Sequence, residues 1–419
     1  MAWTYEAAID YLYSFIDYEV RREVRYAPDV MNLDRPLALL EGLGNPQQHY
    51  AVIHITGTKG KGSVGANCFA ALKAAGLRAG LYSSPHLQDF RERFRAGDGY
   101  MSQEEFTELL AEIKPVVDRS EGLTWFEITT ALAFLYFARL GLDAVVTEVG
   151  LGGRLDATNV VSPAVSVITS LSYDHMHLLG NTLAEIAAEK AGIIKPGVPV
   201  VSAPQQPEAE AVLRRIAAER GAPLIIVGQD WQYEFGATDR CGQAFKAAPT
   251  GAPLHDYWTP LIGHHQVING VVALAALDVV RQAGLPLPPE VVAAGLRRVD
   301  WPGRFEIVSD DPWLVFDAAH NGASASCLRE TLQAVFPDAS RVVVLFGASA
   351  DKDVHGMFTA LLPAVDDLLL VQAVHPRALS PDELAAQVEA VGYTGNVERI
   401  PVISEALARA RELAGADGV

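Results

Sequence analysis

The sequence predicts an α/β protein with two domains, each built on a parallel β-sheet flanked by helices. Short apolar runs alternate with helical segments from residue 51 onward, and the same rhythm begins again after a proline-marked break near residue 300. Such alternation is typical of βαβ units, in which each parallel strand is followed by a covering helix. A chain of 419 residues is long enough for two or three domains. We therefore expect a larger domain over residues 1–298 and a smaller one over residues 299–419.

The first domain opens with two expected helices, 5–20 and 33–43, before any strand. Its expected strands are short apolar runs at 51–56, 78–84, 143–150, 164–170 and 198–203. The expected helices between them are 67–76, 102–117, 124–141 and 182–192. Ser102, followed three residues later by Glu105, is the pattern of a capping box and marks one helix start.

Residues 224–262 have a different pattern, which predicts short β segments and loops before a helix over 265–284. The second domain repeats the order of strand and helix. Its expected strands are 313–320, 341–349 and 367–374, and its expected helices are 324–336 and 380–392. This order predicts a smaller, Rossmann-like α/β domain.

Charge and composition argue against some classes of function. The formal net charge is −18 at pH 7, whereas broad nucleic-acid binding needs a basic surface. The three cysteines lie far apart, so no disulfide framework is implied. The first residues carry acids where a signal peptide carries bases. The most apolar helix, 129–142, is interrupted by Arg139 and is too short to cross a bilayer. We expect a soluble cytoplasmic protein that binds neither nucleic acid nor membrane.

Chemically active side chains follow four expected strands of the first domain. In open α/β sheets, ligands bind beyond the carboxyl ends of the strands. The segments at these ends are a glycine-rich loop at 57–63, the run Ser83-Ser84-Pro85-His86, Glu148 with the stretch 150–159, and Tyr173-Asp174-His175. One edge of the sheet is therefore expected to gather glycines, hydroxyls, a carboxylate and an imidazole.

The glycine-rich loop lies within HITGTKGKGSV, residues 54–64. It departs from the common phosphate-loop spelling G-x-x-x-x-G-K-[ST]. A strand that ends in glycines and opens a helix presents backbone N–H groups to an anion. Lys61 would then reach the β/γ phosphates and Ser63 would face Mg²⁺, with Gly62 allowing the turn. The alternative is a βα turn whose glycines serve close packing alone.

Three further residues each have a functional and an ordinary interpretation. Glu148 suits a Mg²⁺ ligand, because Mg²⁺ prefers oxygen ligands, but a helix-cap or salt-bridge acid is the alternative. His175 is a candidate ligand or a hydrogen-bonded structural histidine. Lys190 is a candidate site residue, although a lysine within a helix is usually solvated.

The second domain also has polar residues at strand ends. Asp317, His320 and Asn321 follow one strand, and Asp351-Lys352-Asp353 follow the next. The alternative for these residues is turn chemistry, because Asp and Asn favour turns. Arg304 lies near the expected domain junction, where its cation could reach a phosphate. The alternative is an ordinary surface arginine.

These segments together resemble the folylpolyglutamate synthases and dihydrofolate synthases of the Mur ligase superfamily. The matching pieces lie in the family's order across residues 33–380. They are HITGTKGKGS, YSSPHL, TEVGLGGRLDATNV, DHMHLLGNTLAEIAAEKAGIIKPG, GHHQVINGVVALAAL, WPGRFE, DAAHN and GASADKD. The resemblance implies a phosphate-loop-containing parallel-sheet ATPase domain followed by a Rossmann-like glutamate-ligase domain. It also implies an ATP-dependent ligase that forms an acyl phosphate on a substrate carboxylate and then an amide with L-glutamate.

The resemblance also implies a role for each site residue. Residues implied in catalysis are Lys61, His175, Lys190, Arg304, Asp317 and His320, with Lys190 carbamylated. Residues implied in ATP binding are Gly57, Thr58, Gly60, Lys61, Gly62, Ser63, Asn269, Arg304 and Asp317. Residues implied in binding substrate are Ser83, Pro85, His86, Arg154, Asp156, Ala157 and His320. Ser84, Glu148 and His175 are the implied ligands of two Mg²⁺ ions, with Ser83 the less favoured choice of serine.

Some features refine the resemblance. The spelling GGRLDATN is similar to bifunctional members, which also add the first glutamate to dihydropteroate. DAAHN replaces the usual DGAHN, and we expect the second domain to lack the family's last strand, which would alter part of the glutamate pocket. A monomer with small-molecule substrates is expected. The alternatives are another Mur-type amino-acid ligase and a phosphate-loop nucleotide switch without ligase activity.

Overall fold

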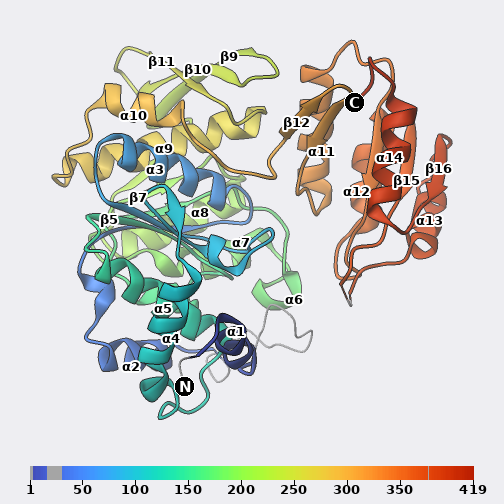
Figure 1. Ribbon diagram of the computed structural model, residues 1–419. Helices are drawn as coiled ribbons and strands as arrows, with labels where there is room; N and C mark the ends of the chain where they lie inside the picture. Colours follow the sequence, from blue (N-terminus) through green and yellow to red (C-terminus); the bar gives the residue numbers. More distant parts are fainter. Residues whose placement is uncertain (1–2, 17–30, 376) are drawn as a thin grey trace. The chain divides into compact units, whose positions relative to one another are not determined.

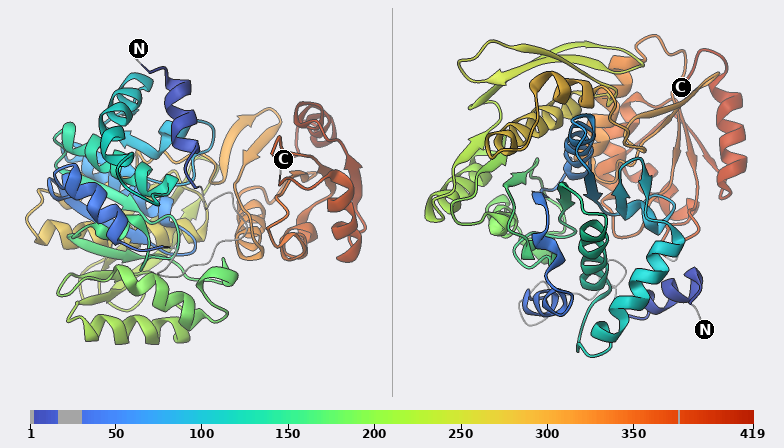
Figure 2. Two further views of the ribbon diagram at one scale, coloured as in Figure 1. Left: turned by 90° about the horizontal axis from the view of Figure 1, so that it is seen from below. Right: turned by 60° about the vertical axis from the view of Figure 1, so that its left-hand side comes forward.

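The protein is described by a computed structural model that covers residues 3–16, 31–375 and 377–419 (Figures 1 and 2). It divides into two compact units. The first unit comprises Met1–Glu234, Phe245–Trp258 and Ile268–Asp300, and the second comprises Phe235–Ala244, Thr259–Val267 and Trp301–Val419. The boundary expected near residue 298 stays a prediction, because both units are discontinuous in sequence.

The first unit is built on an eight-stranded sheet of order β4-β3-β2-β5-β1-β6-β7-β8. Its strands are β1 (Ala51–Thr56), β2 (Ala79–Tyr82), β3 (Phe94–Ala96), β4 (Gly99–Tyr100), β5 (Ala144–Glu148), β6 (Val165–Ile168), β7 (Val200–Ser202) and β8 (Leu224–Ile226). The six strands from β2 to β8 pair in parallel. The predicted parallel sheet is confirmed, and β3 and β4 add an antiparallel hairpin at one edge that the sequence pattern did not indicate.

Helices cover both faces of this sheet (Figure 1). The helices of this unit include α1 (Tyr5–Tyr13), α2 (Asp34–Gly42), α3 (Lys61–Ala74), α4 (Gln103–Val117), α5 (Trp125–Arg139), α6 (Met176–Leu179), α7 (Leu183–Lys190), α8 (Pro207–Glu219) and α10 (Pro289–Leu296). The helix expected over 5–20 ends at Tyr13, and residues 17–20 of that prediction lie outside the described residues. Helix α8 was not predicted.

The alternation of side chains along the strands explains why two layers of helices are needed. Leu81 and Val146 face Gly65 of α3. Their strand neighbours Tyr82 and Val145 point the other way, into the apolar cluster that contains α4 and α5. Successive residues of a strand point to opposite faces, so both faces of this apolar sheet need cover. Burial of a large apolar side chain contributes about 1.5–3 kcal/mol relative to exposure.

Four elements run through the division between the units. They are β9 (Trp231–Thr238), β10 (Gln243–Pro249), β11 (His255–Thr259) and α9 (His264–Gln282). The three strands form a separate sheet of order β11-β10-β9. The prediction of short β segments before a helix is confirmed here.

The second unit has a small parallel sheet and an antiparallel pair of strands. The parallel strands are β14 (Val343–Phe346), β15 (Asp367–Leu370) and β16 (Asn396–Arg399), and the pair is β12 (Glu306–Asp310) with β13 (Trp313–Phe316). The helices are α11 (Gly322–Val335), α12 (Val354–Leu361), α13 (Pro381–Ala390) and α14 (Ile403–Ala414). β12, β16, α12 and α14 were not predicted, whereas the small α/β domain itself is confirmed.

The final residues lie along β14. Val343 donates its N–H to the carbonyl of Val419 at 2.8 Å, and Val419 donates to the carbonyl of Arg341 at 2.9 Å. This alternation is the hydrogen-bond pattern of a parallel pair. The expected absence of the family's last strand stays a prediction.

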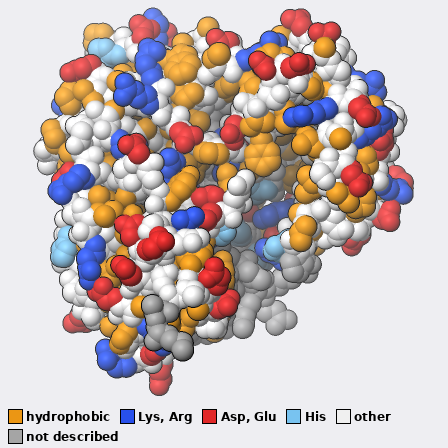
Figure 3. All heavy atoms as spheres, in the orientation of Figure 1, with side chains coloured by type: hydrophobic (Ala, Val, Ile, Leu, Met, Phe, Trp, Pro, Cys, Tyr) orange, Lys and Arg blue, Asp and Glu red, His pale blue; other side chains and the backbone are white. Residues whose placement is uncertain are grey.

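Two surface properties accompany this fold. Among the helices of the described residues, none combines the length and apolar character needed to cross a membrane. On the face shown in Figure 3, basic and acidic side chains are interspersed rather than gathered by sign.

Candidate active site

The glycine-rich loop connects β1 to α3, and two of its glycines are required by their surroundings. Gly57 has φ +153°, and a Cβ at this position would lie 1.8 Å from Oγ1 of Thr169. Gly60 has φ +88°, and a Cβ there would lie 2.4 Å from Oδ1 of Asn269. The structure therefore brings Asn269, a predicted ATP contact, against the loop. Only glycine fits at these two positions.

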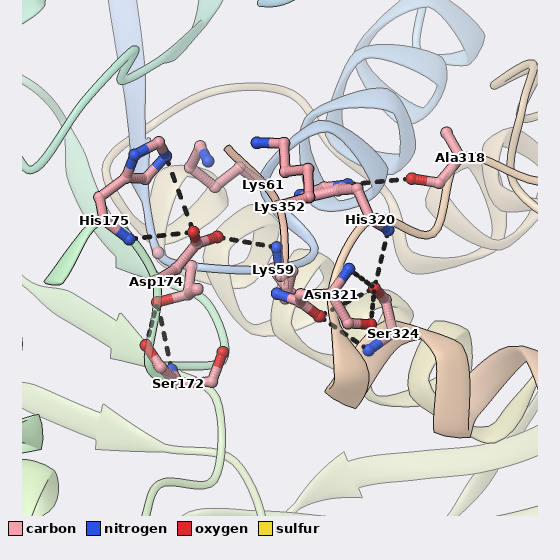
Figure 4. A network of polar contacts seen from close by, with 12 residues as sticks. Lys59, Lys61, Ser172, Asp174, His175, Ala318, His320, Asn321, Ser324 and Lys352 are labelled. Carbon is pink, nitrogen blue, oxygen red and sulfur yellow. Dashed lines mark hydrogen bonds and ion pairs between the residues drawn. The ribbon is translucent and has the colours of Figure 1, made fainter. Parts of the chain in front are cut away.

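The loop is tied to the segment that follows β6. The N–H groups of Thr58 and Lys59 donate to the carbonyl of Ser170 at 2.9 and 3.1 Å. The Thr58 hydroxyl donates to the Ser172 carbonyl and accepts from the Ser172 N–H, both at 3.1 Å. Lys59 Nζ lies 2.9 Å from Oδ2 of Asp174 (Figure 4). Two strand ends thus form one ordered edge, as the sequence predicted, although the sequence analysis gave Lys59 and Asp174 no role there.

Lys61 and Glu148 lie together at this edge. Lys61 is the first residue of α3, and its Nζ is 3.7 Å from Oε1 of Glu148. The other Glu148 oxygen accepts the N–H of Ser84 at 3.3 Å. Glu148 ends β5 and is only 4% exposed. A carboxylate is tolerated at this depth because a cation and an N–H group compensate its burial.

This arrangement suits Mg²⁺ held mainly by oxygen. Mg²⁺ is usually bound through one or two carboxylates, with waters and substrate phosphates as the other ligands. Glu148 supplies a carboxylate, and Ser84 brings a hydroxyl-bearing residue beside it. No cluster of three or more His, Cys, Asp or Glu side chains suited to a metal occurs in the described part of the chain. The residues therefore fit an ion shared with phosphates rather than an all-protein cage.

The preceding residue, Asp174, helps to position His175. It has φ +49°, which is uncommon for a residue other than glycine. Its N–H donates to Oδ1 of Asp174 at 3.0 Å, and its Nε2 lies 3.9 Å from the same oxygen. The imidazole is nearly half exposed. An exposed imidazole beside a carboxylate remains able to bind a ligand.

Lys190 is buried, so its interpretation as a solvated helix lysine is wrong. It ends α7 and is only 5% exposed. Its Nζ donates to the carbonyl of Gly57 at 2.8 Å, which joins α7 to the phosphate loop. Burial, and secondarily the charge of Lys61, lowers the pKa of Lys190 to about 7. A large fraction of this amine is therefore unprotonated near neutral pH.

The stretch 150–159, which we call the β5 loop, packs against the end of α7. Arg154 forms a two-point ion pair with Glu189, with N–O distances of 2.9 and 3.0 Å. A Cβ on Gly153 would lie 2.8 Å from the Lys190 carbonyl, so glycine permits this approach. Ala157, also predicted to bind substrate, is buried in this loop. The predicted substrate loop and the predicted carbamylated lysine are thus in direct contact.

Asp156, the single acidic residue of the β5 loop, is buried. Its carboxylate accepts the N–H groups of Leu151 and Thr158, both at 2.9 Å, and the Thr158 hydroxyl at 2.5 Å. Burial raises the pKa of Asp156, and these hydrogen bonds act in the opposite direction. The hydrogen bonds to the carboxylate offset part of the effect of burial.

The segment after β2 is supported by an arginine that the sequence pattern did not mark. Ser84 and Pro85 are joined by a cis peptide bond. Nδ1 of His86 accepts from Nε of Arg93 at 3.1 Å. Arg93 is only 1% exposed and stacks over Trp125, 4.7 Å from the ring centroid. Arginines that lie close together in sequence are normally predicted to be exposed to solvent. The burial of Arg93 is therefore evident only from the packing around it.

The second unit contains the remaining predicted catalytic residues. Asp317 accepts the N–H of Phe305 at 2.9 Å and the N–H of Ala319 at 2.7 Å. Burial raises the pKa of Asp317, and Arg304 is among the groups that counter this effect. Arg304 donates to the Gly303 carbonyl at 2.9 Å. Within this unit, the structure therefore brings Arg304 and Asp317 into one neighbourhood.

His320 and Asn321 lie at the start of α11. The His320 N–H donates to the Ser324 hydroxyl, and its Nδ1 lies 2.9 Å from the Ala318 carbonyl (Figure 4). Asn321 caps the helix by accepting the Ser324 N–H at 2.9 Å. Asn321 therefore has a local structural role as the N-cap of α11.

The sequence analysis also gave no role to His265, a partly buried histidine of the second unit. Burial, together with the charges of His264 and Arg304, lowers the pKa of His265 to about 4. A neutral imidazole at this position limits the repulsion that Arg304 would otherwise meet.

Comparison with known proteins assigns both parts of the chain to one class of ligase. The Mur ligase middle domain matches residues 55–277, and the Mur ligase glutamate ligase domain matches residues 303–419. The fold and the phosphate-loop site thus define a Mur ligase.

Comparison with individual proteins shows which family within the Mur ligases this chain resembles. The dihydrofolate synthase/folylpolyglutamate synthase of Bacillus subtilis is 37% identical over 365 residues, which cover 83% of this chain and 82% of that protein. The folylpolyglutamate synthase of Lacticaseibacillus casei is 37% identical over 354 residues, covering 82% of each chain. The structure of Escherichia coli FolC in complex with DHPP and ADP matches with a TM-score of 0.88 at 31% identity, covering 100% of this chain and 94% of that one. The chain therefore belongs to the folylpolyglutamate synthase/dihydrofolate synthase family, and the resemblance of its motifs is confirmed.

Proposed function

We propose that this protein is an ATP-dependent ligase that adds L-glutamate to folates and, as a bifunctional enzyme, to dihydropteroate. The observation that carries this proposal is the joint placement of Lys61, Glu148 and Lys190 around one glycine-rich loop. Membership of the family adds the substrate class, since its relatives include folylpolyglutamate and dihydrofolate synthases.

The reaction has two steps. The substrate carboxylate attacks the γ-phosphorus of ATP, which breaks the bond to ADP and forms an acyl phosphate. The unprotonated amine of L-glutamate then attacks the acyl carbon to form a tetrahedral intermediate, which expels phosphate and leaves the amide. Phosphoryl transfer depends mostly on positioning and charge neutralisation, so a covalent protein nucleophile is not needed.

The first unit supplies the neutralising groups in this proposal. Backbone N–H groups of the phosphate loop and the Lys61 ammonium bind the β/γ phosphates. Ser84, Glu148 and His175 would hold two Mg²⁺ ions, which supply further positive charge to the phosphate oxygens. Ser63 follows Gly62 in the first turn of α3, and its hydroxyl is proposed to face the same centre.

Lys190 is proposed to act as a carbamate. The ammonium first loses a proton; the neutral amine then attacks CO₂, forms an N–C bond and releases a second proton, so that a cation becomes an anion. The lowered pKa supports this step, because only the neutral amine is nucleophilic. Carbon-13-labelled bicarbonate should produce a carbamate carbonyl signal in the wild type and none in Lys190→Ala. In addition, small carboxylic acids should partly restore turnover to Lys190→Ala, and full activity of that variant without them would remove Lys190 from the mechanism.

In the second unit, Arg304 is proposed to neutralise phosphate, and Asp317 and His320 to bind the incoming glutamate and phosphate. The partly buried Asp317 carboxylate, whose pKa is affected by Arg304, supports this assignment. Asn269 of the first unit, which contacts the phosphate loop, is proposed to contact ATP.

Incorporation of labelled glutamate tests the proposal directly. ATP-dependent product should form with dihydropteroate and, in a separate assay, with a reduced folate. Product from only one of the two acceptors would end the bifunctional assignment. ATP hydrolysis at the same rate with and without folate and glutamate, and no labelled product, would overturn the ligase assignment itself.

A further inference from the structure

Strand β1 holds the β5 loop with two side chains from one face. His54 and Thr56 are two residues apart in the strand, so they point to the same side. The Thr56 hydroxyl donates to the Gly152 carbonyl at 2.7 Å, and His54 Nε2 lies 2.9 Å from Oγ1 of Thr158. Each of these side chains is fully buried. Strand β1, which leads into the phosphate loop, is therefore hydrogen-bonded to the β5 loop near both ends of that loop.

The direction of each hydrogen bond follows from the number of protons available. Thr158 has one hydroxyl proton, which lies in the 2.5 Å contact with Oδ1 of Asp156. With that proton committed to a carboxylate that already accepts two N–H groups, Thr158 Oγ1 must accept from His54. His54 is then neutral and protonated on Nε2.

The other ring nitrogen supports this assignment. Nδ1 of His54 is buried and has no hydrogen-bond partner among the described residues. The reverse arrangement would leave a proton on Nδ1 with no acceptor, and orphaned buried N–H groups are rarer than orphaned acceptors. Burial also lowers the pKa of His54 to about 3, so the ring stays neutral across the physiological range.

We propose that His54 is a positioning residue for the pterin-bearing substrate, acting through Thr158 on Asp156 of the β5 loop. This inference rests on the proposed function, which assigns Asp156 to substrate binding. The chain of donors runs from His54 to the Thr158 hydroxyl and on to Oδ1 of Asp156, so it helps to fix the orientation of this carboxylate. A loop held in its binding conformation before substrate arrives loses less conformational entropy on binding.

Two substitutions at His54 separate positioning from packing. In His54→Gln, the side-chain amide keeps an N–H donor close to the place of Nε2, whereas His54→Leu removes it. We expect His54→Leu to raise KM for the pterin-bearing acceptor about tenfold, the size of one lost hydrogen bond. KM for ATP should stay within about twofold, and His54→Gln should recover most of the loss.

A second pair of variants covers the case in which His54→Leu fails to fold. Thr158→Val is close in shape but lacks the hydroxyl, and Thr158→Ser retains it. Thr158→Val should raise KM for the acceptor as His54→Leu does, and Thr158→Ser should resemble the wild type. Where both single variants fold, the double variant should be no worse than the weaker of them, because both break the same chain.

Other results would overturn the inference. An unchanged acceptor KM in folded His54→Leu or Thr158→Val removes the positioning role. Equal changes in the KM values for ATP and acceptor, or a loss of kcat that matches only the loss of folded protein, assigns His54 to structure alone. A wild-type enzyme that incorporates no glutamate would instead defeat the proposed function, so the two failures are distinguishable.

Discussion

The phosphate loop of the first unit and the 317–321 turn of the second unit are held in different ways. The first is tied by contacts between residues far apart in sequence, such as Lys190 with Gly57 and Thr58 with Ser172. The second is held largely by neighbours, such as Asn321 with Ser324. Long-range contacts need the whole sheet to be formed, whereas caps and turns form locally. Substitutions that break the long-range contacts of the first region should therefore change activity most, and loss of a local cap in the second region, such as that of Asn321, should have a smaller and more local effect.

Lys61→Ala is expected to have the largest effect on activity. It removes the cation that faces Glu148 and is proposed to bind the phosphates, so kcat/KM should fall about 100- to 1,000-fold. Lys59→Ala is the matched control, because Lys59 pairs with Asp174 instead. Steady-state glutamate incorporation measures both. Equal losses in the two variants would show that general loop charge, rather than Lys61 itself, is required.

Gly57→Ala should have the next largest effect. The added Cβ meets Thr169 Oγ1 at 1.8 Å, so the loop must shift, and activity should fall about 100-fold. Gly76→Ala is the control, because Gly76 also has positive φ, at +75°, but a Cβ there meets nothing within 4 Å. The control should lose only about 1–2 kcal/mol of stability and keep its kinetic constants. An equal loss of activity in both variants would mean that the strain of a positive φ, and not the close contact with Thr169, decides the effect at Gly57.

Lys190 should make stability depend on pH. Its folded-state pKa of about 7 lies below the ordinary lysine value of 10.5, so the unfolded chain binds more protons between these values. The free energy of unfolding should therefore rise with pH across that window, by at most about 1.4 kcal/mol per pH unit from this group. Lys190→Met should lack this contribution while losing catalytic activity. Denaturant unfolding at pH 7 and pH 9, in buffer free of CO₂, measures the difference between the two proteins, and parallel pH profiles would contradict the burial of a titrating Lys190.

Asn321→Ala should have the smallest effect. Loss of the cap on α11 should cost about 1 kcal/mol of stability. Asn321→Asp, which can still accept the Ser324 N–H, should retain most of it. Thermal unfolding detects this difference. A loss of several kcal/mol in Asn321→Ala would mean that the second region depends on more than local caps.

Local signals were sufficient for much of the architecture. The Ser102–Glu105 capping box marks the start of α4, as predicted. The run of apolar residues ending in glycines at 51–57 correctly predicted β1 and its loop. These features depend on residues within one turn or one strand, so a single sequence contains what is needed to find them. The family resemblance followed from several such segments in one order.

The burial of individual polar residues could not be predicted from local sequence in the same way. Lys190, Arg93 and His54 are polar residues that would ordinarily be exposed, yet each is enclosed by segments distant in sequence. Whether a charge is solvated depends on what packs around it, and that packing also lowers the pKa of Lys190 and His54. The amino-acid order therefore predicted much of the order of strands and helices, the phosphate loop and the family. Only the tertiary structure determined which polar groups are buried, because a side chain is removed from water by several segments that pack around it.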